Sequence, residues 1–308
     1  MNKNEEKKSK KDCFEYYANY YLKQSKIKNK ASTYSCYCYV VKSRILPYFK
    51  DKKIKSINNN TILCYTEKLI KNGLSNKTIK DTLTILYAIL KKGNNKIEVI
   101  YPRIKKNNIK VLKKEEQLQL EEYLINNLNN ITFGIYLSLY TGLRIGEICS
   151  LKWSDIDTSQ NIITIKNTVS RIKLDKSYHK TKIIISEAKS KSSIREIPLS
   201  SNIKHIISKI DNKNNNNYIL SGCKKNIDPR TFYNKYKKIL NELNIESYTF
   251  HCLRHTFATR CVESGADPKT LSLILGHSSV KITLDRYVHP DLNRKIKLMN
   301  NIDFLYKF

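Results

Sequence analysis

One stretch of the sequence, residues 248–290, contains the residue types needed to hold and attack a phosphate group. His251 and Arg254 lie three positions apart, a spacing that places both side chains on one face of a helix. A guanidinium binds two phosphate oxygens through its planar fork, and imidazole groups can donate further hydrogen bonds to the same charge. A helix predicted from Lys269 to Leu275 ends at Gly276, and His277 follows this break. A last short helix, predicted from Val280, presents Tyr287. Taken singly, His277 could be structural, and Tyr287 is one tyrosine among 21.

A second arginine occurs where an apolar helix is predicted to end. In the segment TGLRIGE, Thr141 and Gly142 interrupt a run of apolar residues, and Arg144 follows directly. Arg144 is therefore expected to project from the start of the next short helix. By itself it could form an ordinary ion pair with Glu147, an arrangement that is common and contributes little to stability. A role beside Arg254 at a phosphate is the alternative, and the remaining motifs favour it.

Three further residues receive supporting or structural interpretations. Glu147 is expected to orient a neighbouring side chain of the site through a hydrogen bond. His255 is expected on a different face of the helix from His251, where a buried, hydrogen-bonded role fits better than a catalytic one. Trp153, the only tryptophan, lies just after the first arginine segment and is expected in the core.

Five segments of the chain resemble, in the same order, those of the tyrosine recombinases of the phage integrase family. Members of that family carry an arginine segment, a lysine in a β-hairpin, a paired histidine and arginine, a glycine–histidine pair and a nucleophilic tyrosine. The matching segments here are TGLRIGE, EAKSKSSIREIPL, HCLRHTFAT, LGHSS and ITLDRYVH, within residues 114–290. One such motif would be a weak signal, whereas five in order are highly specific.

The resemblance implies that Arg144, His251, Arg254 and His277 surround the scissile phosphate of DNA and that Tyr287 attacks it. The implied product is a phosphotyrosyl bond to the 3′ end of the cut strand, with a free 5′ hydroxyl. A tyrosine hydroxyl, with a pKa near ~10, is a weak nucleophile at neutral pH, and surrounding positive charge makes its deprotonation easier. Attack by a different 5′ hydroxyl rejoins the strand. Since one phosphodiester replaces another, no cofactor and no metal ion are expected.

The family's lysine acts as a general acid that protonates the leaving 5′ oxygen. Lys189 fits the spacing K-[TS]-x-x-S-x-R, with Ser193 and Arg195 following. Lys191 lies two residues nearer the second strand and would point to the same face of the hairpin. The spacing favours Lys189 as the general acid. The alternative is that both lysines simply contact phosphates at the surface.

The composition fits a protein that binds a polyanion. In 308 residues there are 57 lysines and arginines against 27 acidic residues, which gives a formal charge of +30. Such a chain repels itself unless anionic material is near, although an AT-rich genome could also enrich lysine. Eight scattered cysteines lack a C-x-x-C pair, so we expect reduced thiols and no zinc site at Cys36 and Cys38. No apolar run approaches a membrane span or a signal peptide, which favours a cytoplasmic, nucleoid-associated protein.

The order of polar and apolar segments predicts two domains. The predicted parts are a disordered basic tail (1–11), a helical domain (12–95), a basic interdomain linker (96–113), a mixed domain (114–290) and a C-terminal tail (291–308). The family resemblance implies that residues 12–95 are a core-binding (SAM-like) DNA-binding domain and that residues 114–290 are the tyrosine recombinase catalytic domain. The tail carries apolar residues at near-helical spacing and is expected to dock on a neighbouring protomer. These residues are Leu292, Ile296, Met299 and Leu305.

The predicted fold class is mainly α with a small antiparallel β-sheet. Apolar residues at helical spacing predict four helices between Phe14 and Leu90, the last capped by Ser75 or Asn76. The second domain is expected to be mixed α/β. Its predicted elements are helices near 115–127 and 131–140, β-rich runs at 161–166, 182–186 and 194–200, and further helices after Ser201.

The predicted function is site-specific DNA recombination that integrates or excises a mobile element. The expected partners are double-stranded DNA, further copies of the chain in a homotetramer on two recombination sites, and an excisionase or other accessory factor. Three other activities would use the same features. A type IB topoisomerase-like enzyme relaxes one duplex, chromosome or plasmid multimer resolution uses the same chemistry, and an inactive repressor would keep only DNA binding.

Overall fold

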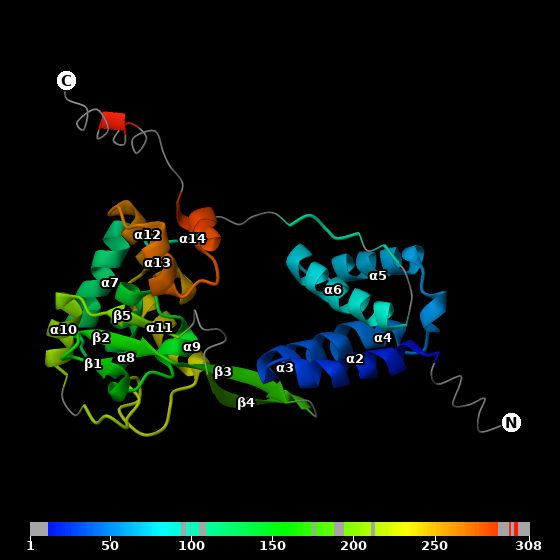
Figure 1. Ribbon diagram of the computed structural model, residues 1–308, viewed down its shortest axis with the longest axis horizontal. Coiled ribbons are helices and arrows are strands. Elements are labelled where there is room, and N and C mark those ends of the chain that lie inside the picture. The colour runs from blue at the N-terminus through cyan, green and yellow to red at the C-terminus, as the bar shows by residue number, and fades with distance from the viewer. Residues whose placement is uncertain are drawn as a thin grey trace. The chain divides into compact units, whose positions relative to one another are not determined.

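The computed structural model describes most of the chain, which divides into two compact units. One unit comprises residues 1–107 and 171–183, and the other comprises residues 108–170 and 184–308. Figure 1 shows the helices and strands of both units. The described residues are 12–93, 97–98, 100–104, 109–174, 177–187, 194–210, 213–288, 296 and 299–300.

The described part of the first unit is mostly helical. Its helices are α2 (Phe14–Lys28), α3 (Ala31–Val40), the π-helical turn η1 (Val41–Ile45), α4 (Leu46–Phe49), the 3-10 turn η2 (Ile54–Ser56), α5 (Asn59–Lys71) and α6 (Asn76–Lys92). Because α3, η1 and α4 follow one another without a break, they form one continuous segment. The four helical segments predicted for this part of the chain are therefore confirmed.

Side-chain caps set the starts of the last two helices of this unit. The Asn58 carboxamide oxygen accepts a hydrogen bond from the Thr61 backbone N–H at 3.0 Å, at the start of α5. The Ser75 hydroxyl accepts one from the Thr78 N–H at 3.3 Å, so Ser75 is the cap of α6. Each cap satisfies a backbone donor that has no partner within the helix.

Aromatic residues join the helices of the first unit around one core. Phe14, Phe49 and Tyr65 are fully buried, and the rings of Phe49 and Tyr65 lie 4.8 Å apart in an edge-to-face arrangement. The Tyr65 hydroxyl donates a hydrogen bond to the Arg44 carbonyl at 3.0 Å. That bond lets a tyrosine occupy the core without leaving its hydroxyl unpaired.

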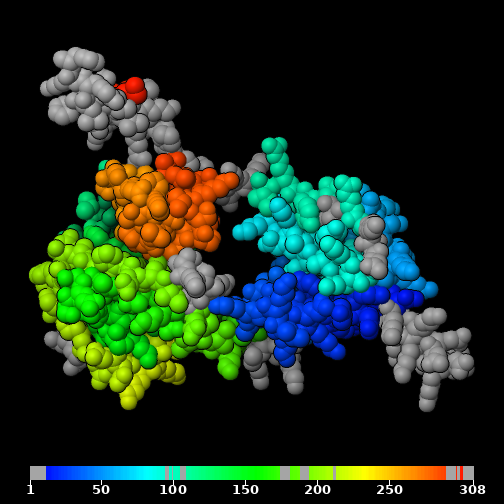
Figure 2. Space-filling view, in the orientation of Figure 1, coloured from blue at the N-terminus to red at the C-terminus, as the bar shows by residue number. Residues whose placement is uncertain are grey.

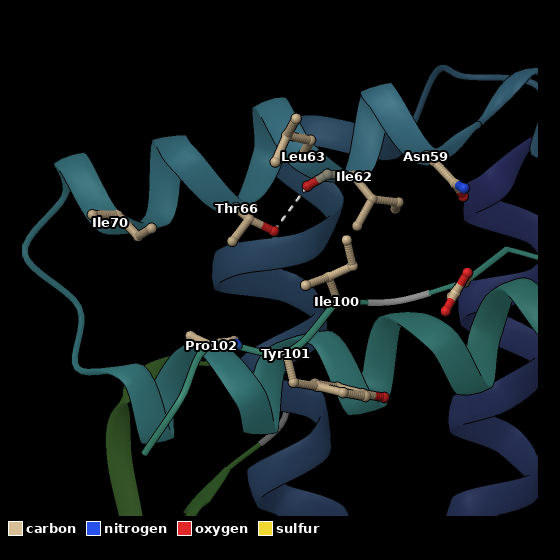
Figure 3. Close-up of a pocket in the computed structure, with 9 residues that line it drawn as sticks. Asn59, Ile62, Leu63, Thr66, Ile70, Ile100, Tyr101 and Pro102 are labelled. Carbon is tan, nitrogen blue, oxygen red and sulfur yellow. Dashed lines mark hydrogen bonds between the residues drawn. The ribbon is translucent and has the colours of Figure 1, made fainter. Parts of the chain in front are cut away.

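Described residues of the predicted linker pack on the first unit. Ile97 is buried in its core, and the Asn76 carboxamide donates to the Arg103 carbonyl at 2.9 Å. Figure 3 shows an apolar groove between α5 and the residues that follow α6. The groove is lined by Asn59, Ile62, Leu63, Thr66, Ile70, Glu98, Ile100, Tyr101 and Pro102. The sequence pattern did not indicate that part of the linker would lie along a helix.

The second unit is mixed α/β. Its helices are α7 (Lys114–Asn126), α8 (Asn130–Thr141), α9 (Ile145–Ile148), the 3-10 turn η3 (Trp153–Asp155), α10 (Ser201–Ser208), α11 (Pro229–Glu242), α12 (His251–Glu263), α13 (Pro268–Leu275) and α14 (Val280–Tyr287). Its strands are β1 (Ile156–Asp157), β2 (Ile162–Ile165) and β5 (Arg195–Pro198). Two further strands, β3 (Asn167–Leu174) and β4 (Ser177–Glu187), are divided between the two units. In the described ranges, no helix is both long and apolar enough to cross a membrane.

The strands form two sheets rather than the single small sheet expected from the sequence. β1, β2 and β5 form a three-stranded antiparallel sheet, in which Ile163 faces Ile197 and Ile165 faces Arg195. β3 and β4 pair separately, so the predicted strand at 182–186 belongs to this second sheet. Residues 171–183 of β3 and β4 are part of the first unit. Alternating apolar residues predict a strand but do not determine its partner, which explains the difference.

Helix α8 lies at the centre of the second unit. Asn129 caps it by accepting hydrogen bonds from the Ile131 and Thr132 N–H groups, and its apolar side chains are buried over almost its whole length. Phe133 stacks on Trp153 with ring centroids 5.7 Å apart, and Trp153 is buried. The prediction that Trp153 belongs to the core is therefore confirmed.

Helices α12, α13 and α14 pack together through a small apolar cluster. The cluster consists of Ala258, Val262, Leu271, Leu275 and Tyr287, with Ile109, Phe257, Cys261 and Val288 at its edge. Figure 2 shows these helices, orange to red, as one continuous region of the surface. The predicted helices from Lys269 to Leu275 and from Val280 are confirmed as α13 and α14.

Two glycines end helices that contribute to this region. Gly142 follows α8 with φ +66°, and Gly276 follows α13 with φ +63°, both in the left-handed conformation that suits glycine. A methyl group at position 142 would also lie 2.7 Å from Leu275 Cδ2 and 2.8 Å from Phe257 Cδ1. The end of α8 can therefore approach α12 and α13 only because residue 142 has no side chain.

We expect Gly142→Ala to lower the free energy of unfolding of the second unit more than Gly265→Ala does. Gly265 also has a positive φ, +88°, but a methyl group there would meet no atom within 4 Å. Both variants incur the left-handed penalty of about 1–2 kcal/mol, and Gly142→Ala adds overpacking of about 1–3 kcal/mol. Urea unfolding followed by the fluorescence of Trp153 measures both. Equal losses would show that the close approach at Gly142 is unimportant.

Candidate active site

Arg254 is held by the carbonyl groups that end two helices. It lies in the first turn of α12 and is 1% exposed. Its Nη1 donates to the Gly142 carbonyl at 2.8 Å and its Nη2 to the Leu275 carbonyl at 2.7 Å. Carbonyl groups at helix C-termini have no partner within the helix and carry partial negative charge, so they suit a buried guanidinium.

Arg144, which lies far from Arg254 in the sequence, contacts the same C-terminal end of α13. It is the N-cap of α9, as predicted, and its Nη2 donates to the Gly276 carbonyl at 3.1 Å. Leu275 and Gly276 are consecutive residues, so the guanidinium groups of Arg254 and Arg144 are brought to adjacent carbonyls. Burial, followed by the positive charge of Arg144, lowers the pKa of Arg254. The guanidinium still remains protonated at neutral pH because its intrinsic pKa is so high.

Glu147 links Arg144 to Arg195. Its carboxylate accepts from Arg144 Nη1 at 2.8 Å and from Arg195 Nη2 at 2.9 Å. The side chains of Glu147 and Arg195 are only 7% and 5% exposed. Burial alone would raise the pKa of Glu147, but Arg195 and Arg144 outweigh it and hold that pKa at about 2. The carboxylate therefore stays ionised and orients both arginines, in agreement with the role expected for Glu147.

Arg195 enters the site from an inward-facing position of β5. Its Nε donates to the Ile274 carbonyl at 2.5 Å, so it also ties β5 to α13. The sequence had identified Arg195 only as part of the lysine spacing. The inward-facing alternation of Arg195 and Ile197 along β5 could have indicated its burial.

Two of the predicted histidines lie around these arginines. His277 directly follows Gly276, and its Nδ1 lies 2.8 Å from the Thr283 hydroxyl. Partial burial, then the charges of Arg254 and Arg144, lower the pKa of His277 to about 3. His251 is exposed overall, but its ring lies against that of His255. Partial burial of the ring, then the charges of Arg254 and Arg144, lower the pKa of His251 to about 4. Both imidazoles are therefore neutral at pH 7.

Tyr287 ends α14 inside this group of side chains. It is 6% exposed, and its ring is parallel to that of His277, with centroids 6.4 Å apart. Burial raises the pKa of Tyr287, although Arg254 and Arg286 act in the opposite direction. The hydroxyl is therefore protonated at neutral pH in the free protein.

The structure corrects the interpretation of His255. Its Nδ1 lies 2.7 Å from the Tyr287 hydroxyl oxygen, and its ring lies 4.5 Å from that of His251. His255 therefore shares a face of α12 with His251 rather than facing a different side. The four-residue spacing between the two histidines could have indicated this, because such residues are neighbours on a helix.

The arrangement brings five of the six predicted site residues together: Arg144, His251, Arg254, His277 and Tyr287. Lys189, like its alternative Lys191, lies outside the described residues. In the described part of the chain β4 pairs with β3 and β5 pairs with β2, so the hairpin assumed for the lysine is not formed by β4 and β5. Within the same ranges, no group of three or more His, Cys, Asp and Glu side chains could hold a metal ion. The guanidinium groups of Arg144, Arg195 and Arg254 outnumber the single carboxylate of Glu147, so net positive charge remains, which suits a phosphate.

The fold and this site define an enzyme of DNA strand exchange. Residues 110–294 match the phage integrase family, and residues 13–81 match the family's N-terminal SAM-like domain. The chain belongs to the phage integrase family, and it is a tyrosine-type site-specific DNA recombinase. The predicted family, fold class and enzyme class are thus confirmed.

Similar proteins come from bacteria and mobile elements. The chain is 28% identical to a XerC-like tyrosine recombinase of Caldanaerobacter subterraneus subsp. tengcongensis, over 82% of this chain and 73% of that protein. It is 25% identical to the ICEBs1 integrase of Bacillus subtilis, over 97% of this chain and 85% of that protein. The family match and the ICEBs1 integrase support site-specific recombination for the integration or excision of mobile elements, as predicted.

Solved structures share the fold. The Tn1549 transposon integrase in complex with a circular intermediate DNA superposes with a TM-score of 0.75 at 19% identity, covering 93% of this chain and 99% of that chain. A lambda integrase tetramer bound to a Holliday junction gives a TM-score of 0.64 at 17% identity, covering 94% and 83%.

We expect Glu147→Gln to destabilise the second unit strongly, because it leaves Arg195 buried without its carboxylate partner. Breaking a buried pair from one side costs about 3–5 kcal/mol. Glu263→Gln is the matched control, since Glu263 pairs with Arg260 at 2.9 Å on the surface. Its cost should stay within about 1 kcal/mol. Urea unfolding by Trp153 fluorescence measures both, and similar small costs would contradict a structural role for the buried pair.

The stability of the second unit should fall as the solution is acidified. The folded pKa values of His251, His255 and His277 lie below the 6.5 of an unperturbed histidine, so below pH 6.5 the unfolded chain takes up protons first. Stability is therefore lost from about pH 6.5 down to the folded pKa values, which are about 4 for His251 and His255 and about 3 for His277. Glu147, with its pKa lowered from 4.5 to about 2, adds a second loss between those values.

The measurement is urea unfolding at pH 7 and pH 5. His277→Gln should reduce the difference between the two, because it removes one titrating group. His205→Gln, at an exposed position on α10, should leave the difference unchanged. Equal stability of the unaltered protein at the two pH values would show that the folded protein does not lower the pKa values of these histidines.

Proposed function

We propose that the cationic group in the second unit binds the scissile phosphodiester of DNA. Arg144 and Arg254 contact its non-bridging oxygens, with His251 and His277 as further hydrogen-bond donors. The observation that carries this proposal is the position of Tyr287, whose hydroxyl lies within the group rather than at a distance from it. A phosphate bound there would stand beside a nucleophile.

In the proposed reaction the Tyr287 oxygen attacks the phosphorus and loses its proton. The bond between phosphorus and the 5′ oxygen breaks, and that oxygen takes a proton from Lys189, or from Lys191, as general acid. The product is a 3′-phosphotyrosyl bond and a free 5′ hydroxyl. Attack by another 5′ hydroxyl reverses these steps and joins the new strands. One phosphodiester is exchanged for another, so the chemistry needs no nucleotide cofactor.

The proposal predicts a covalent adduct that depends on Tyr287. The protein is incubated with a suicide substrate prepared from the DNA that flanks its gene. In this substrate a nick lies shortly beyond the scissile phosphate, so cleavage releases a short fragment that carries the free 5′ hydroxyl and the strand cannot be rejoined. The unaltered protein should accumulate a DNA adduct on a denaturing gel, and Tyr287→Phe should form none. Tyr236→Phe, which alters a buried tyrosine of α11, is the matched control and should still form it. Adduct formation by Tyr287→Phe would place the nucleophile elsewhere.

We also propose a role for each segment of the chain. Residues 12–95 would be the core-binding DNA-binding domain, 96–113 the linker and 114–290 the catalytic domain. The excess of 30 positive charges supports binding that depends on phosphate contacts and weakens steeply with salt. A protein acting on the cell's DNA would work in the cytoplasm at the nucleoid. An excisionase or another accessory factor would set the direction of the reaction.

A homotetramer on two recombination sites is the assembly that we propose. The tetramer that lambda integrase forms on a Holliday junction supports it by analogy. We further propose that residues 291–308 dock on a neighbouring protomer. In support, the described residues Ile296 and Met299 are 48% and 57% exposed, and they lie three positions apart.

Deleting residues 291–308 should leave DNA binding intact and abolish assembly of two sites, because the docking segment is gone. Ile296→Asp should have a similar effect, whereas Asn300→Asp adds the same charge at an exposed polar position and should not. Gel-shift titration measures binding, and native gels of two labelled duplexes measure assembly. Intact recombination by the truncated protein would refute tail docking.

A further inference from the structure

In the described part of the chain, the Tyr287 hydroxyl lies within hydrogen-bond distance of His255, a residue outside the set that the family resemblance assigns. The distance between its oxygen and His255 Nδ1 is 2.7 Å, which is a normal hydrogen bond. The two rings are 5.7 Å apart and inclined at 52°, so the contact is made edge-on to a ring nitrogen rather than by stacking. His255 is therefore placed to receive or donate a proton at the nucleophilic atom.

Packing on both sides holds this pair in place. Tyr287 belongs to the buried cluster that includes Ala258 and Val262, which lie on the same helix as His255. On the other side of His255, the His251 ring meets it at 4.5 Å and 82°, in an edge-to-face contact. The distance between the imidazole and the phenol is thus set by the contact of α14 with α12.

The charged surroundings keep the imidazole ready to accept a proton. The groups that face His255 are His251 and Arg254 from α12, and Arg286 and Tyr287 from α14. His277 stands behind the Tyr287 ring. Partial burial, then the charge of His251, Arg286 and Arg254, lowers the pKa of His255 to about 4, so the ring is neutral at pH 7. A bound phosphate would offset those positive charges and make the imidazole a stronger base.

We propose that His255 positions the Tyr287 hydroxyl and accepts its proton as the phosphotyrosyl bond forms. The inference rests on the proposed function, in which Tyr287 is the nucleophile. As the Tyr287 oxygen bonds to phosphorus, its proton passes to His255 Nδ1. The bond between phosphorus and the 5′ oxygen breaks at the same time. The leaving 5′ oxygen receives its proton from the separate general acid. In the rejoining step the His255 imidazolium returns the proton to the departing tyrosine oxygen, so protons balance over the cycle.

The test compares His255→Asn and His255→Ala with the unaltered full-length protein. The asparagine amide can replace a hydrogen bond at the Nδ1 position but cannot accept a proton. Single-turnover cleavage of the suicide substrate at saturating protein should slow about 100-fold in both variants, the lower end of what a general base contributes. DNA affinity, measured by fluorescence anisotropy, should not change, which shows that the variants are folded.

The pH profile separates proton transfer from a packing role. Between pH 6.5 and 8.5 the rate of the unaltered protein should change little, because His255 is already neutral. The rates of both variants should rise about tenfold per pH unit, as hydroxide replaces the missing base. A variant rate that is uniformly low and independent of pH would overturn the inference, since it would indicate damage to packing alone.

A substrate with sulfur in place of the bridging 5′ oxygen separates the two proton transfers. A thiolate leaves without a proton, so the defect of Lys189→Ala should largely disappear on this substrate, while that of His255→Asn should persist. Rescue of His255→Asn by sulfur would place its effect on the leaving group and overturn the inference. His205→Asn, at an exposed histidine of α10, is the control and should behave as the unaltered protein on both substrates.

Failure of the inference and failure of the proposed function give different results. If Tyr287→Phe forms the adduct, the nucleophile itself is wrong, and the role of His255 falls with it. If Tyr287→Phe is inactive while His255→Asn and His255→Ala cleave at the unaltered rate, only the role of His255 is refuted. Faster cleavage by either His255 variant would also refute it, because it would mean that the contact restrains the nucleophile.

Discussion

Two guanidinium groups hold the carbonyl ends of helices α8 and α13 next to each other. Arg254 bonds to Gly142 and Leu275, and Arg144 bonds to Gly276, so each arginine replaces the partner that a helix end lacks. The bonds satisfy the carbonyl groups but do not neutralise the arginines. Positive charge therefore remains concentrated where three distant parts of the sequence meet.

The other features of the site follow from that charge. Glu147 is kept ionised by two arginines and orients them, and the neighbouring imidazoles are kept neutral. Tyr287 is buried among them and still carries its proton. A site in this condition is prepared for a phosphate, because one bound anion would relieve the repulsion among the positive groups and raise the pKa of the neighbouring imidazoles. The same folded scaffold thus lowers the cost of the reaction before the substrate arrives.

Much of this arrangement could be predicted because it is encoded in local patterns. Helix starts and ends near Ser75, Gly142 and Gly276 follow from capping chemistry, and the ordered motifs brought five site residues into one hypothesis. The separate pairing of β3 with β4 could not be predicted, since alternation specifies a strand without specifying its neighbour. The carbonyl partners of Arg144 and Arg254 were also out of reach, because backbone atoms have no signature in the sequence. The prediction for His255 was wrong, although its four-residue spacing from His251 indicates a shared helix face. The contact of His255 with Tyr287 of α14 could not be predicted, because the sequence does not show how these two helices pack.

The central claim is that these guanidinium and imidazole groups converge on one phosphate of DNA. It is tested most directly by the pKa values of His251 and His277, measured by nitrogen-15 NMR of the histidine side chains in the Tyr287→Phe protein, free and bound to a duplex that carries its recombination site. The account predicts that binding raises both pKa values, because the phosphate offsets the charge of Arg144 and Arg254. Unchanged or lower values in the complex would contradict it.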